Sequence, residues 1–401
     1  MSTLFVKYLN DIKISNLTSS HVTEFIQQEH RTFFDGASKI LFNDSRHALT
    51  PRVGPTITEV GIDARWIRYD SSYRAEARLK KFWCVELSDA VIYPPYGIVR
   101  IGDTFIKDTI RKLADLQDVL KNVSNDNLDK AFRDPCYGIE CDLLPVSKII
   151  DERAFVLGSG VFGNYFNWTL RYISKINTFQ KSGVRLLISP PTKIPYILDS
   201  LRFFGINIDN LIQLREPIRV KTMVLASPVA LGRYQLSPQI CQNLRGHSSV
   251  RSLSLQGKSR KIYVPRRDVK MRSVKDADLV DNFFTEQGFL VFDNSVNKIA
   301  DQIAAFSAAE IVVAVHGAGL ANIVYCRPGT LIVEIVPEGY DQGVTSYRSL
   351  SDLFSLNYIQ VFAKEELVDR KGNRCNSDIS IDLVDIKTLL LELETTRPVF
   401  S

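Results

Sequence analysis

The segment that follows residues 311–315 has the composition of an anion-binding turn. Residues 311–315 (IVVAV) are entirely apolar and lead directly into His316, Gly317, Ala318 and Gly319. Small residues after a strand let backbone N–H groups approach an anion closely, and the positive end of a helix that begins here would face it. Histidine adds a donor that can be charged near neutral pH. The pattern predicts a site for the diphosphate of a nucleotide. The alternative is a tight strand-to-helix turn whose histidine is bonded within the fold.

Arginines follow a second predicted strand. Arg266 and Arg267 come directly after the strand at residues 261–264, and Arg272 comes shortly afterwards. The carboxyl ends of parallel strands meet at one edge of a sheet, so these side chains are expected near His316. Guanidinium groups hold phosphate oxygens in pairs, which makes them suitable partners for a diphosphate. By themselves the arginines would equally form a solvated basic loop.

Glu334 lies inside the otherwise apolar segment 331–336 (LIVEIV). A carboxylate in such a strand is costly unless it is hydrogen-bonded. It is expected either to accept a bond from a ribose hydroxyl or to bond within the fold, to neighbouring backbone or to Asn322.

A glycine-rich segment resembles a dinucleotide fingerprint. Gly158, Gly160 and Gly163 fit the GxGxxG pattern between a predicted strand and a predicted helix. The fingerprint also needs an acidic residue at the end of the next strand to bind the ribose. That strand ends in ISPP at residues 188–191, without an acid. The segment is therefore interpreted as a glycine-rich turn, with a nicotinamide or flavin site as the alternative.

These motifs are connected by two series of alternating strands and helices. The first series has predicted strands at 154–157, 184–189, 211–214 and 223–226, with helices at 164–179 and 194–204. The second has strands at 261–264, 289–292, 311–315 and 331–336, with helices at 276–287 and 298–308. Outside them, a strand is predicted at 85–93, a turn at 94–97 and helices at 106–123 and 383–394. Such alternation predicts the α/β class, with parallel sheets covered by helices.

Four segments are expected along the chain. They are an N-terminal extension with short helices (1–75), a first Rossmann-like lobe (76–245), a second Rossmann-like lobe (246–365) and a tail (366–401) whose helix packs on the first lobe. The polar stretch at about 241–260 is interpreted as an interdomain linker. Ligands of open α/β sheets bind at the carboxyl ends of the strands, which places the predicted site in a central cleft.

Composition narrows the class of protein. The chain has 401 residues, and 50 Lys+Arg against 45 Asp+Glu give a net charge of +5, too weak to predict nucleic-acid binding without a concentrated patch. Six scattered cysteines without a CxxC pair predict free thiols in a reducing compartment. The sequence shows neither a signal peptide nor an apolar run long enough to span a membrane. A cytoplasmic protein is expected.

Taken in order, the motifs resemble glycosyltransferase family 61, and in particular its bacterial capsule- or lipopolysaccharide-type members. The residues that carry the resemblance are Arg266-Arg267, the helix from Asp276, Gly288-Phe289, Gln302-Ile303 with Phe306, the run from His316 to Asn322, and Pro328-Gly329-Thr330 followed by Glu334. Gly163 to Trp168 (GNYFNW) resembles the motif of the family's N-terminal lobe. The resemblance is specific over about 260–340 and looser over about 85–240.

The resemblance implies a GT-B-like fold, with the acceptor bound by the lobe at 76–245 and the nucleotide sugar by the lobe at 246–365. It also implies an inverting, metal-independent transfer and, for a bacterial member, peripheral contact at the inner membrane. The donor would be a nucleotide sugar, UDP-linked, and the acceptor a glycan or lipid-linked oligosaccharide, with no cofactor and no metal. The donor contacts implied by the motifs, joined by Arg272 and Glu334 from their positions after and within strands, are Arg266, Arg267, Arg272, His316, Gly317, Ala318, Gly319, Asn322 and Glu334. The acceptor contacts are Asn164, Tyr165, Asn167, Trp168 and Arg171.

Two positions depart from the family pattern. The family has His where this chain has Asn167, and an acidic residue where it has Arg171. Inverting transfer needs a general base, and neither Asn nor Arg supplies one near neutral pH. Glu338 and Asp341 are candidate substitutes, or else ordinary loop carboxylates, and His316 is a further candidate. The departures keep open a catalytically degenerate nucleotide-sugar-binding protein; a nicotinamide-dependent oxidoreductase is the other alternative.

Overall fold

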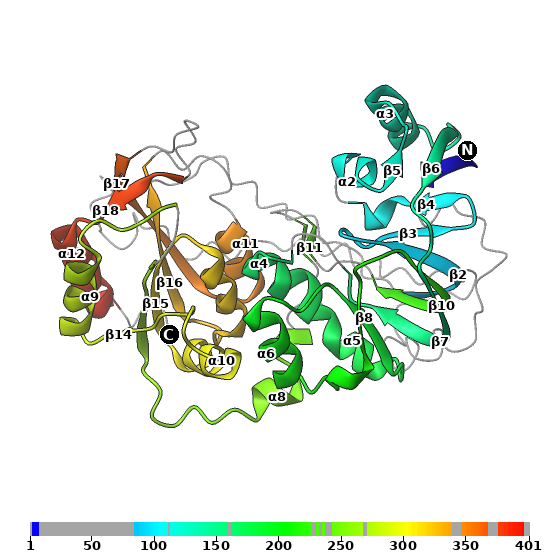
Figure 1. The fold of residues 1–401 in the computed structure, drawn as a ribbon. Coiled ribbons are helices and arrows are strands. Elements are labelled where there is room, and N and C mark those ends of the chain that lie inside the picture. The colour runs from blue at the N-terminus through cyan, green and yellow to red at the C-terminus, as the bar shows by residue number, and fades with distance from the viewer. Residues whose placement is uncertain are drawn as a thin grey trace. The chain divides into compact units, whose positions relative to one another are not determined.

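The computed structural model describes residues 2–7, 84–110, 113–158, 162–226, 230–231, 235–236, 243–267, 271–338, 346–367 and 376–396. The protein is of the mixed α/β class (Figure 1). Its contacts divide it into two compact units, of which the described residues up to Ala226 form the first and those from Ala230 onward the second.

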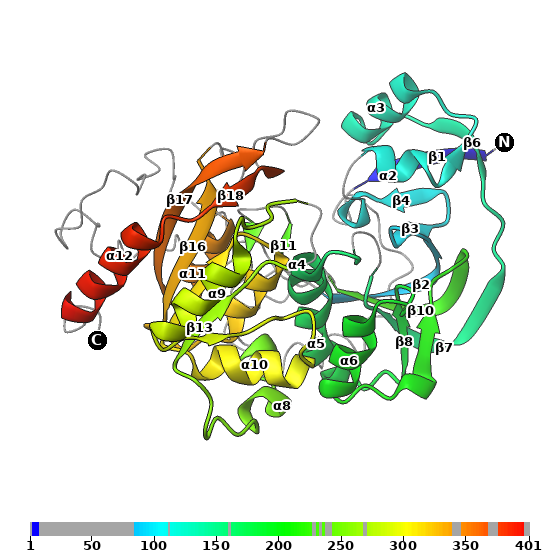
Figure 2. The same ribbon diagram turned by 60° about the vertical axis from the view of Figure 1, so that its left-hand side comes forward.

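The sheet of the first unit has mixed strand directions and curls into a half-barrel (Figure 2). Its strands are β1 (Ser2–Lys7), β2 (Cys84–Tyr93), β3 (Ile98–Ile101), β4 (Thr104–Ile106), β5 (Leu120–Lys121), β6 (Ile139–Leu143), β7 (Lys148–Val156), β8 (Leu186–Ser189), β9 (Leu211–Gln213) and β10 (Ile218–Ala226). They follow the order β5-β6-β1-β4-β3-β2-β10-β7-β8-β9.

The expectation of a parallel sheet in this unit is correct for only part of it. Strands β10, β7, β8 and β9 are parallel neighbours, whereas β2 pairs antiparallel with both β3 and β10. The predicted turn at 94–97 explains why β2 and β3 are antiparallel. Gly97 has a left-handed φ of 71° and its N–H donates to the carbonyl of Tyr93 at 2.9 Å. Such a short connection joins antiparallel strands, since a parallel pair needs a longer crossover.

Strand β1 was not expected. Residues 2–7 fall in the predicted helical extension, but they form a strand between β6 and β4 with Leu4 and Val6 buried. The rest of that extension, residues 8–75, lies outside the described residues.

The helices of the first unit correct one prediction and refine another. They are η4 (Lys107–Thr109), α2 (Leu113–Gln117), α3 (Asn125–Arg133), α4 (Tyr165–Asn167), η5 (Trp168–Tyr172), η6 (Ile173–Lys175), α5 (Ile176–Lys181), α6 (Pro195–Phe203) and η7 (Ile208–Asn210). The predicted helix at 106–123 is wrong: Ile106 ends β4, Ile110 is extended, and only the short α2 precedes β5. The predicted helix at 164–179 is present as a helical path that changes from α through one π turn and one 3-10 turn back to α.

Four strands of the sheet in the second unit lie where the sequence predicts them, whereas β17 (Asn357–Leu367) and β18 (Asp378–Ser380) were not predicted. The four are β13 (Lys261–Val264), β14 (Leu290–Val291), β15 (Ile311–Val315) and β16 (Leu331–Pro337), and the sheet has the order β14-β13-β15-β16-β17-β18. Every pair is parallel except β17 with β18. A separate two-stranded ribbon joins β11 (Ala230–Leu231) and β12 (Gln235–Leu236).

The helices of this unit are α8 (Ser248–Arg251), α9 (Ala277–Glu286), α10 (Ile299–Ala308), η8 (Ala318–Tyr325), α11 (Ser346–Leu353) and α12 (Leu383–Thr396). Helices α9 and α10 lie where the sequence predicts them, and Gly288 ends α9 with a φ of 76°. Two details differ. Asp276 precedes α9 in a left-handed conformation and makes no side-chain cap, and Leu279, predicted to face inward, is 62% exposed.

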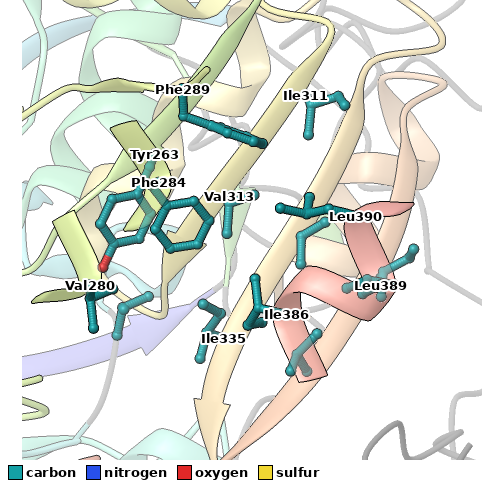
Figure 3. Close-up of a cluster of buried hydrophobic side chains, with 14 of the residues drawn as sticks. Tyr263, Val280, Phe284, Phe289, Ile311, Val313, Ile335, Ile386, Leu389 and Leu390 are labelled. Atoms are coloured by element: carbon teal, nitrogen blue, oxygen red, sulfur yellow. The ribbon is translucent and has the colours of Figure 1, made fainter. Parts of the chain in front are cut away.

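Helix α12 packs on the core of the second unit, which corrects the prediction that it packs on the first. Figure 3 shows Ile386, Leu389 and Leu390 of α12 in one apolar cluster with Val313 of β15 and Ile335 of β16. Their spacing along the helix places these side chains on one face. Helices α9 and α12 therefore cover the same face of the sheet, and α10 and α11 lie on its other side in Figure 1.

The segment predicted as an open linker belongs to the second unit. Leu244 is fully buried, and Arg245 donates through Nε to the carbonyl of Val324 at 3.0 Å and through Nη1 to the carbonyl of Phe354 at 3.1 Å. His247 follows, and its Nδ1 accepts from the backbone N–H of Ser249 at 3.2 Å to cap α8. The polar composition of this segment wrongly indicated an interdomain linker, because its polar side chains are hydrogen-bonded within the second unit.

None of the helices within the described ranges is both long enough and apolar enough to serve as a membrane span. The described cysteines, Cys84, Cys136, Cys141 and Cys326, are free, as predicted.

Replacing Leu389 by Ala tests the placement of α12. Because Leu389 is fully buried in the cluster of Figure 3, the change should lower the free energy of unfolding by about 2–5 kcal/mol. Leu391 on the same helix is 54% exposed, and Leu391→Ala should change it by less than about 0.5 kcal/mol. Urea denaturation of both variants measures the difference. Equal effects would mean that α12 does not pack as described.

Protonation of His247 should destabilise the protein. Burial lowers the pKa of His247 below its ordinary value, so the folded state favours the neutral ring whose Nδ1 accepts the cap bond. This contribution is complete above the pKa of the unfolded state and is lost as the pH falls below it. The loss is measured as the change in free energy of unfolding between about pH 7.5 and about pH 5.5. His247→Asn keeps a capping oxygen that does not titrate in this range, so the variant should lose less stability on acidification. A parallel loss in both proteins would contradict the assignment.

Candidate functional site

Strand pairing brings the predicted residues to one edge of the second sheet. Val264 of β13 pairs with Ala314 of β15, which pairs in turn with Glu334 of β16. Arg266 lies two residues beyond Val264, and His316 lies two residues beyond Ala314. Both side chains therefore leave the sheet at the carboxyl ends of the parallel strands, where open α/β sheets bind ligands.

Arg266 is held against the backbone of the predicted turn. Its Nε donates to the carbonyl of Met271 at 3.0 Å, and its Nη1 lies so close to Gly317 that a Cβ at residue 317 would collide with it. Glycine at 317 is thus required for the guanidinium to reach this position. The close approach places a cation beside the turn after β15.

A second cation lies near Arg266. The pKa of Arg266 is lowered to about 10, mainly by burial and further by the positive charge of Arg272, while Tyr347 acts in the opposite direction. Arg272 is fixed by two hydrogen bonds to Asn376. The backbone N–H of Arg272 donates to the carbonyl of Asn376 at 3.2 Å, and Nη1 of Arg272 donates to Oδ1 of Asn376 at 3.1 Å. Two like charges held in this way repel each other, and a bound anion would relieve the repulsion.

Behind the turn, His316 begins a set of hydrogen-bonded side chains that we call the polar chain: His316, Glu334, Tyr358 and Gln360. Nδ1 of His316 is bonded to Oε1 of Glu334, Tyr358 Oη donates to Glu334 Oε2, and Gln360 Nε2 donates to Tyr358 Oη at 3.3 Å. The Glu334 side chain is 1% exposed and that of His316 13%. Glu334 is thus bonded within the fold, with His316 and Tyr358 as partners in place of the backbone or Asn322.

Tyr347 of α11 fixes the turn from the other side. Its hydroxyl donates to the carbonyl of Gly317 at 2.6 Å, and its ring meets the ring of His316 edge-on, with centroids 5.5 Å apart. Tyr347 is 3% exposed. The position of His316 is therefore set by contacts on two sides.

The remainder of the turn rests on a buried amide network. Ala318 begins η8, and Asn294 Nδ2 donates to the carbonyl of Gly319 at 3.3 Å. Asn322 Nδ2 donates to Gln302 Oε1 at 2.9 Å, and Gln302 Nε2 donates to the carbonyl of Asn294 at 2.8 Å. Because Asn322 is fully buried, its side chain supports the turn from beneath, and its role as a donor contact stays a prediction.

Residues 140–333 match the family model Glycosyltransferase 61. The chain contains a glycosyltransferase 61 domain. It is therefore a glycosyltransferase, an enzyme with a sugar donor and an acceptor. The matched range includes Arg266 and the turn from His316, and it ends within β16. A search of curated proteins gives no match to the chain.

One further predicted donor residue of the glycosyltransferase, Arg267, and the two candidate bases, Glu338 and Asp341, lie apart from this turn in the sequence. Arg267 forms an ion pair with Asp281 of α9, a partner that the sequence did not indicate, so its guanidinium is bound there. Glu338 is exposed just after β16, where its N–H donates to the carbonyl of Ala363 at 3.0 Å. Asp341 lies outside the described residues.

In the first unit of the glycosyltransferase, the predicted acceptor residues surround the start of α4. Asn164 caps this helix by accepting from the N–H of Asn167 at 3.1 Å. Tyr165 is half-buried and meets the ring of Tyr196 edge-on at 5.2 Å. Arg171 is also half-buried, in the π turn that follows.

Trp168 has the surroundings of a core residue. It is fully buried, its Nε1 donates to Ser200 Oγ at 2.8 Å, and its ring stacks on Tyr172 with centroids 5.4 Å apart. Its rings are thus packed within the fold, which fits the interpretation of Trp168 as a core residue better than that of a sugar platform.

The glycine-rich segment after β7 forms a turn that needs its first glycine. Gly158 has a φ of 112°, in the region that favours glycine, and a Cβ there would approach the ring of Tyr172 to 3.0 Å. Lys175 lies beneath it and donates to the carbonyl of Leu157 at 3.3 Å. Residues 159–161 are outside the described part of the chain.

Several residues of the site were missed by sequence analysis. Tyr347, Tyr358, Gln360 and Asn294 lie in or beside elements whose pairing the sequence does not state. One signal was present for two of them: in β17, Tyr358 and Gln360 alternate with the apolar Ile359 and Val361. Since Gln360 pairs with Glu334, these polar residues belong on the same sheet face as Glu334.

Replacing Asn322 by Ala tests the amide network. The change leaves Gln302 Oε1 without its donor in a buried site, which should lower the free energy of unfolding by about 1–3 kcal/mol. Arg327, which is exposed shortly after η8, provides a control, since Arg327→Ala should be nearly neutral. Urea denaturation measures both variants. Unchanged stability of Asn322→Ala would remove the supporting role of the network.

Proposed function

We propose that this glycosyltransferase binds a nucleotide sugar, UDP-linked, at the edge of its second sheet and transfers the sugar with inversion to a glycan acceptor. The observation that carries the proposal is the guanidinium of Arg266, packed against Gly317 beside the second cation Arg272. Arg266 and His316 thus lie at one turn, and the charge of Arg272 acts on Arg266. A diphosphate has the charge and the oxygen spacing that such a group of donors binds.

The chemistry proposed for these residues is stabilisation of the leaving group. When the bond between the sugar and the nucleotide breaks, negative charge develops on the diphosphate. Arg266, Arg272 and His316 would neutralise that charge, so that no divalent cation is needed. The transfer is therefore proposed to be metal-independent, and addition of EDTA should not reduce it.

The general base is proposed among the carboxylates after β16. Inverting displacement removes a proton from the acceptor hydroxyl, and neither Asn167 nor Arg171 accepts it near neutral pH. Glu338 is exposed and follows directly after the strand that contains Glu334, and Asp341 is the second candidate. Asn167 and Arg171 also favour a second function, a degenerate nucleotide-sugar-binding protein.

The wider context follows from the resemblance to capsule- and lipopolysaccharide-type members of the family. We propose a GT-B arrangement, a cytoplasmic location with peripheral contact at the inner membrane, and a growing or lipid-linked oligosaccharide of a bacterial surface polysaccharide as the acceptor. The parallel sheet of the second unit supports the first of these. The mild net charge of +5 is compatible with an anionic membrane surface.

Thermal unfolding with nucleotides tests the donor site. UDP, GDP, CMP and NAD are compared at equal concentration, with and without EDTA. A nucleotide at one hundred times its Kd should stabilise the fold by about 2.7 kcal/mol, and UDP is expected to do so. Stabilisation by NAD alone would contradict the transferase and favour an oxidoreductase.

Two substitutions test the position of the site. Arg266→Ala removes the cation, and Gly317→Ala should displace it, because the new Cβ would occupy the space of Nη1. Each should weaken UDP binding roughly tenfold to hundredfold, the range for one lost hydrogen bond to a charged group. Arg327→Ala removes an exposed cation of the same unit and should leave binding unchanged. If Arg266→Ala bound UDP like the wild type, the donor site would lie elsewhere.

Release of nucleotide from the sugar donor separates an enzyme from a binder. The donor whose nucleotide stabilises the fold is incubated with glycan acceptors, and free nucleotide is measured. Binding without release, with every acceptor, would favour the degenerate protein.

A further inference from the structure

We propose that Arg267 positions its neighbour Arg266 for the donor, through an ion pair with Asp281 of α9 that anchors the chain after β13. Arg267 is then a positioning residue and makes no contact with the diphosphate. The identity of the ligand rests on the proposed function above. The anchoring of Arg266 rests on contacts within the second unit alone.

The two arginines after β13 lie on different sides of the sheet edge. Arg266 reaches Gly317, whose carbonyl is held by Tyr347 of α11. Arg267 reaches Asp281 of α9, and α9 and α11 cover different faces of the sheet (Figure 1). This arrangement continues the alternation of a strand, in which consecutive side chains point to opposite faces. One guanidinium is thus directed to the turn after β15, and the other to α9.

Tyr263 supports this placement of Arg267. Its ring stacks on Phe284 of α9 with centroids 4.0 Å apart, within the apolar cluster of Figure 3. Tyr263 and Arg267 are four positions apart, so they share one side of an alternating chain. Burial raises the pKa of Tyr263, and the positive charge of Arg267 acts in the opposite direction. Arg267 therefore lies at the border of the core beneath α9.

Asp281 requires the cation of Arg267. Asp281 is 7% exposed and both of its carboxylate oxygens are shielded from solvent. Apart from Arg267, the described residues give these oxygens no hydrogen-bond donor. A buried carboxylate without a compensating charge is strongly unfavourable, and a guanidinium is always charged in a protein. Movement of Arg267 to a phosphate would leave Asp281 uncompensated, so the ion pair keeps Arg267 on α9.

The ion pair places Arg266 between two anchored points. On one side is Arg267, and on the other the chain is bound to β18, where the N–H of Ile379 donates to the carbonyl of Ser273 at 2.9 Å. The positive charge of Arg272 acts on Arg266, and without a ligand this repulsion opposes the position of Arg266 at the turn. The anchors resist it and hold Arg266 in place before an anion arrives, which reduces the ordering cost of binding.

Binding of UDP to the full-length chain separates positioning from direct contact. Asp281→Asn removes the partner's charge and leaves Arg267 present. Asp281→Asn and Arg267→Gln should each weaken UDP binding about fivefold, the effect of one ordinary hydrogen bond, and the two together should weaken it no further. If Arg267 contacted the diphosphate, Arg267→Gln would weaken binding, whereas Asp281→Asn would leave it unchanged or strengthen it. That result would overturn the proposal.

A second measurement tests whether the effect passes through Arg266. In a chain that already contains Arg266→Ala, Asp281→Asn should not weaken UDP binding further, and an additional loss would contradict the proposal.

Nitrogen-15 NMR of the arginine side chains then examines the chain without ligand. The Nε–H of Arg266 donates to the carbonyl of Met271 at 3.0 Å and is therefore protected from exchange with water, and Arg266→Lys identifies its signal. A fivefold loss of binding corresponds to about one fifth of the molecules with Arg266 in place. Asp281→Asn should therefore remove most of this protection. Unchanged protection would overturn the proposal.

Two changes on the same helix provide the controls. Asp278 is exposed, and Asp278→Asn removes an equal charge and should leave UDP binding unchanged. Val280 is 3% exposed in the apolar cluster, and Val280→Ala should lower stability but keep both UDP binding and the protection of Arg266. If Val280→Ala weakened binding as Asp281→Asn does, the effect would be structural and the proposal would fail. A wild-type chain with a protected Nε–H that bound no UDP would instead refute the donor site and leave the anchoring of Arg266 intact.

Discussion

The arrangement of the second unit depends on one buried carboxylate, Glu334, in the centre of a parallel sheet. The strand around it is buried along its whole length, so the carboxylate can be neither hydrated nor left without partners. This requirement brings His316 from β15 and Tyr358 from β17 to the same point. Apolar packing on the opposite face, from α9 and α12, holds these strands in the pairing that makes the bonds available (Figure 3).

The two faces of this sheet therefore differ in composition and in what they support. One is a continuous apolar core, and the other supports the polar chain and the turn that Tyr347 and the amide network hold in place. Arg266 reaches the same turn from β13 because glycine occupies position 317. A group of positive charges is thus supported by neutral and anionic groups beneath it. The matched glycosyltransferase 61 range includes the arginines and the turn, whereas most of the polar chain follows it.

Sequence analysis located four strands of this sheet and missed β17 and β18. The strand at 311–315 could be recognised because buried parallel strands are apolar throughout. Arg266 and His316 could be located because both follow predicted strands. Sequence analysis missed Tyr347 and Tyr358, since their roles depend on which elements are neighbours, and chain order does not state that. In the first unit the apolar spacing at 106–123 fits a helix as well as it fits a strand end, a short helix and a second strand, and tertiary pairing selected the latter.

Helix α12 also has a consequence for how the protein is made. Its residues Ile386, Leu389 and Leu393 complete the core that forms around β13, β15 and β16 much earlier in the chain. While the polypeptide emerges from the ribosome, α9 covers only part of this apolar sheet face, and the rest is uncovered until α12 has been synthesised. That interval exposes the nascent chain to chaperones and to aggregation, as incomplete cores generally do.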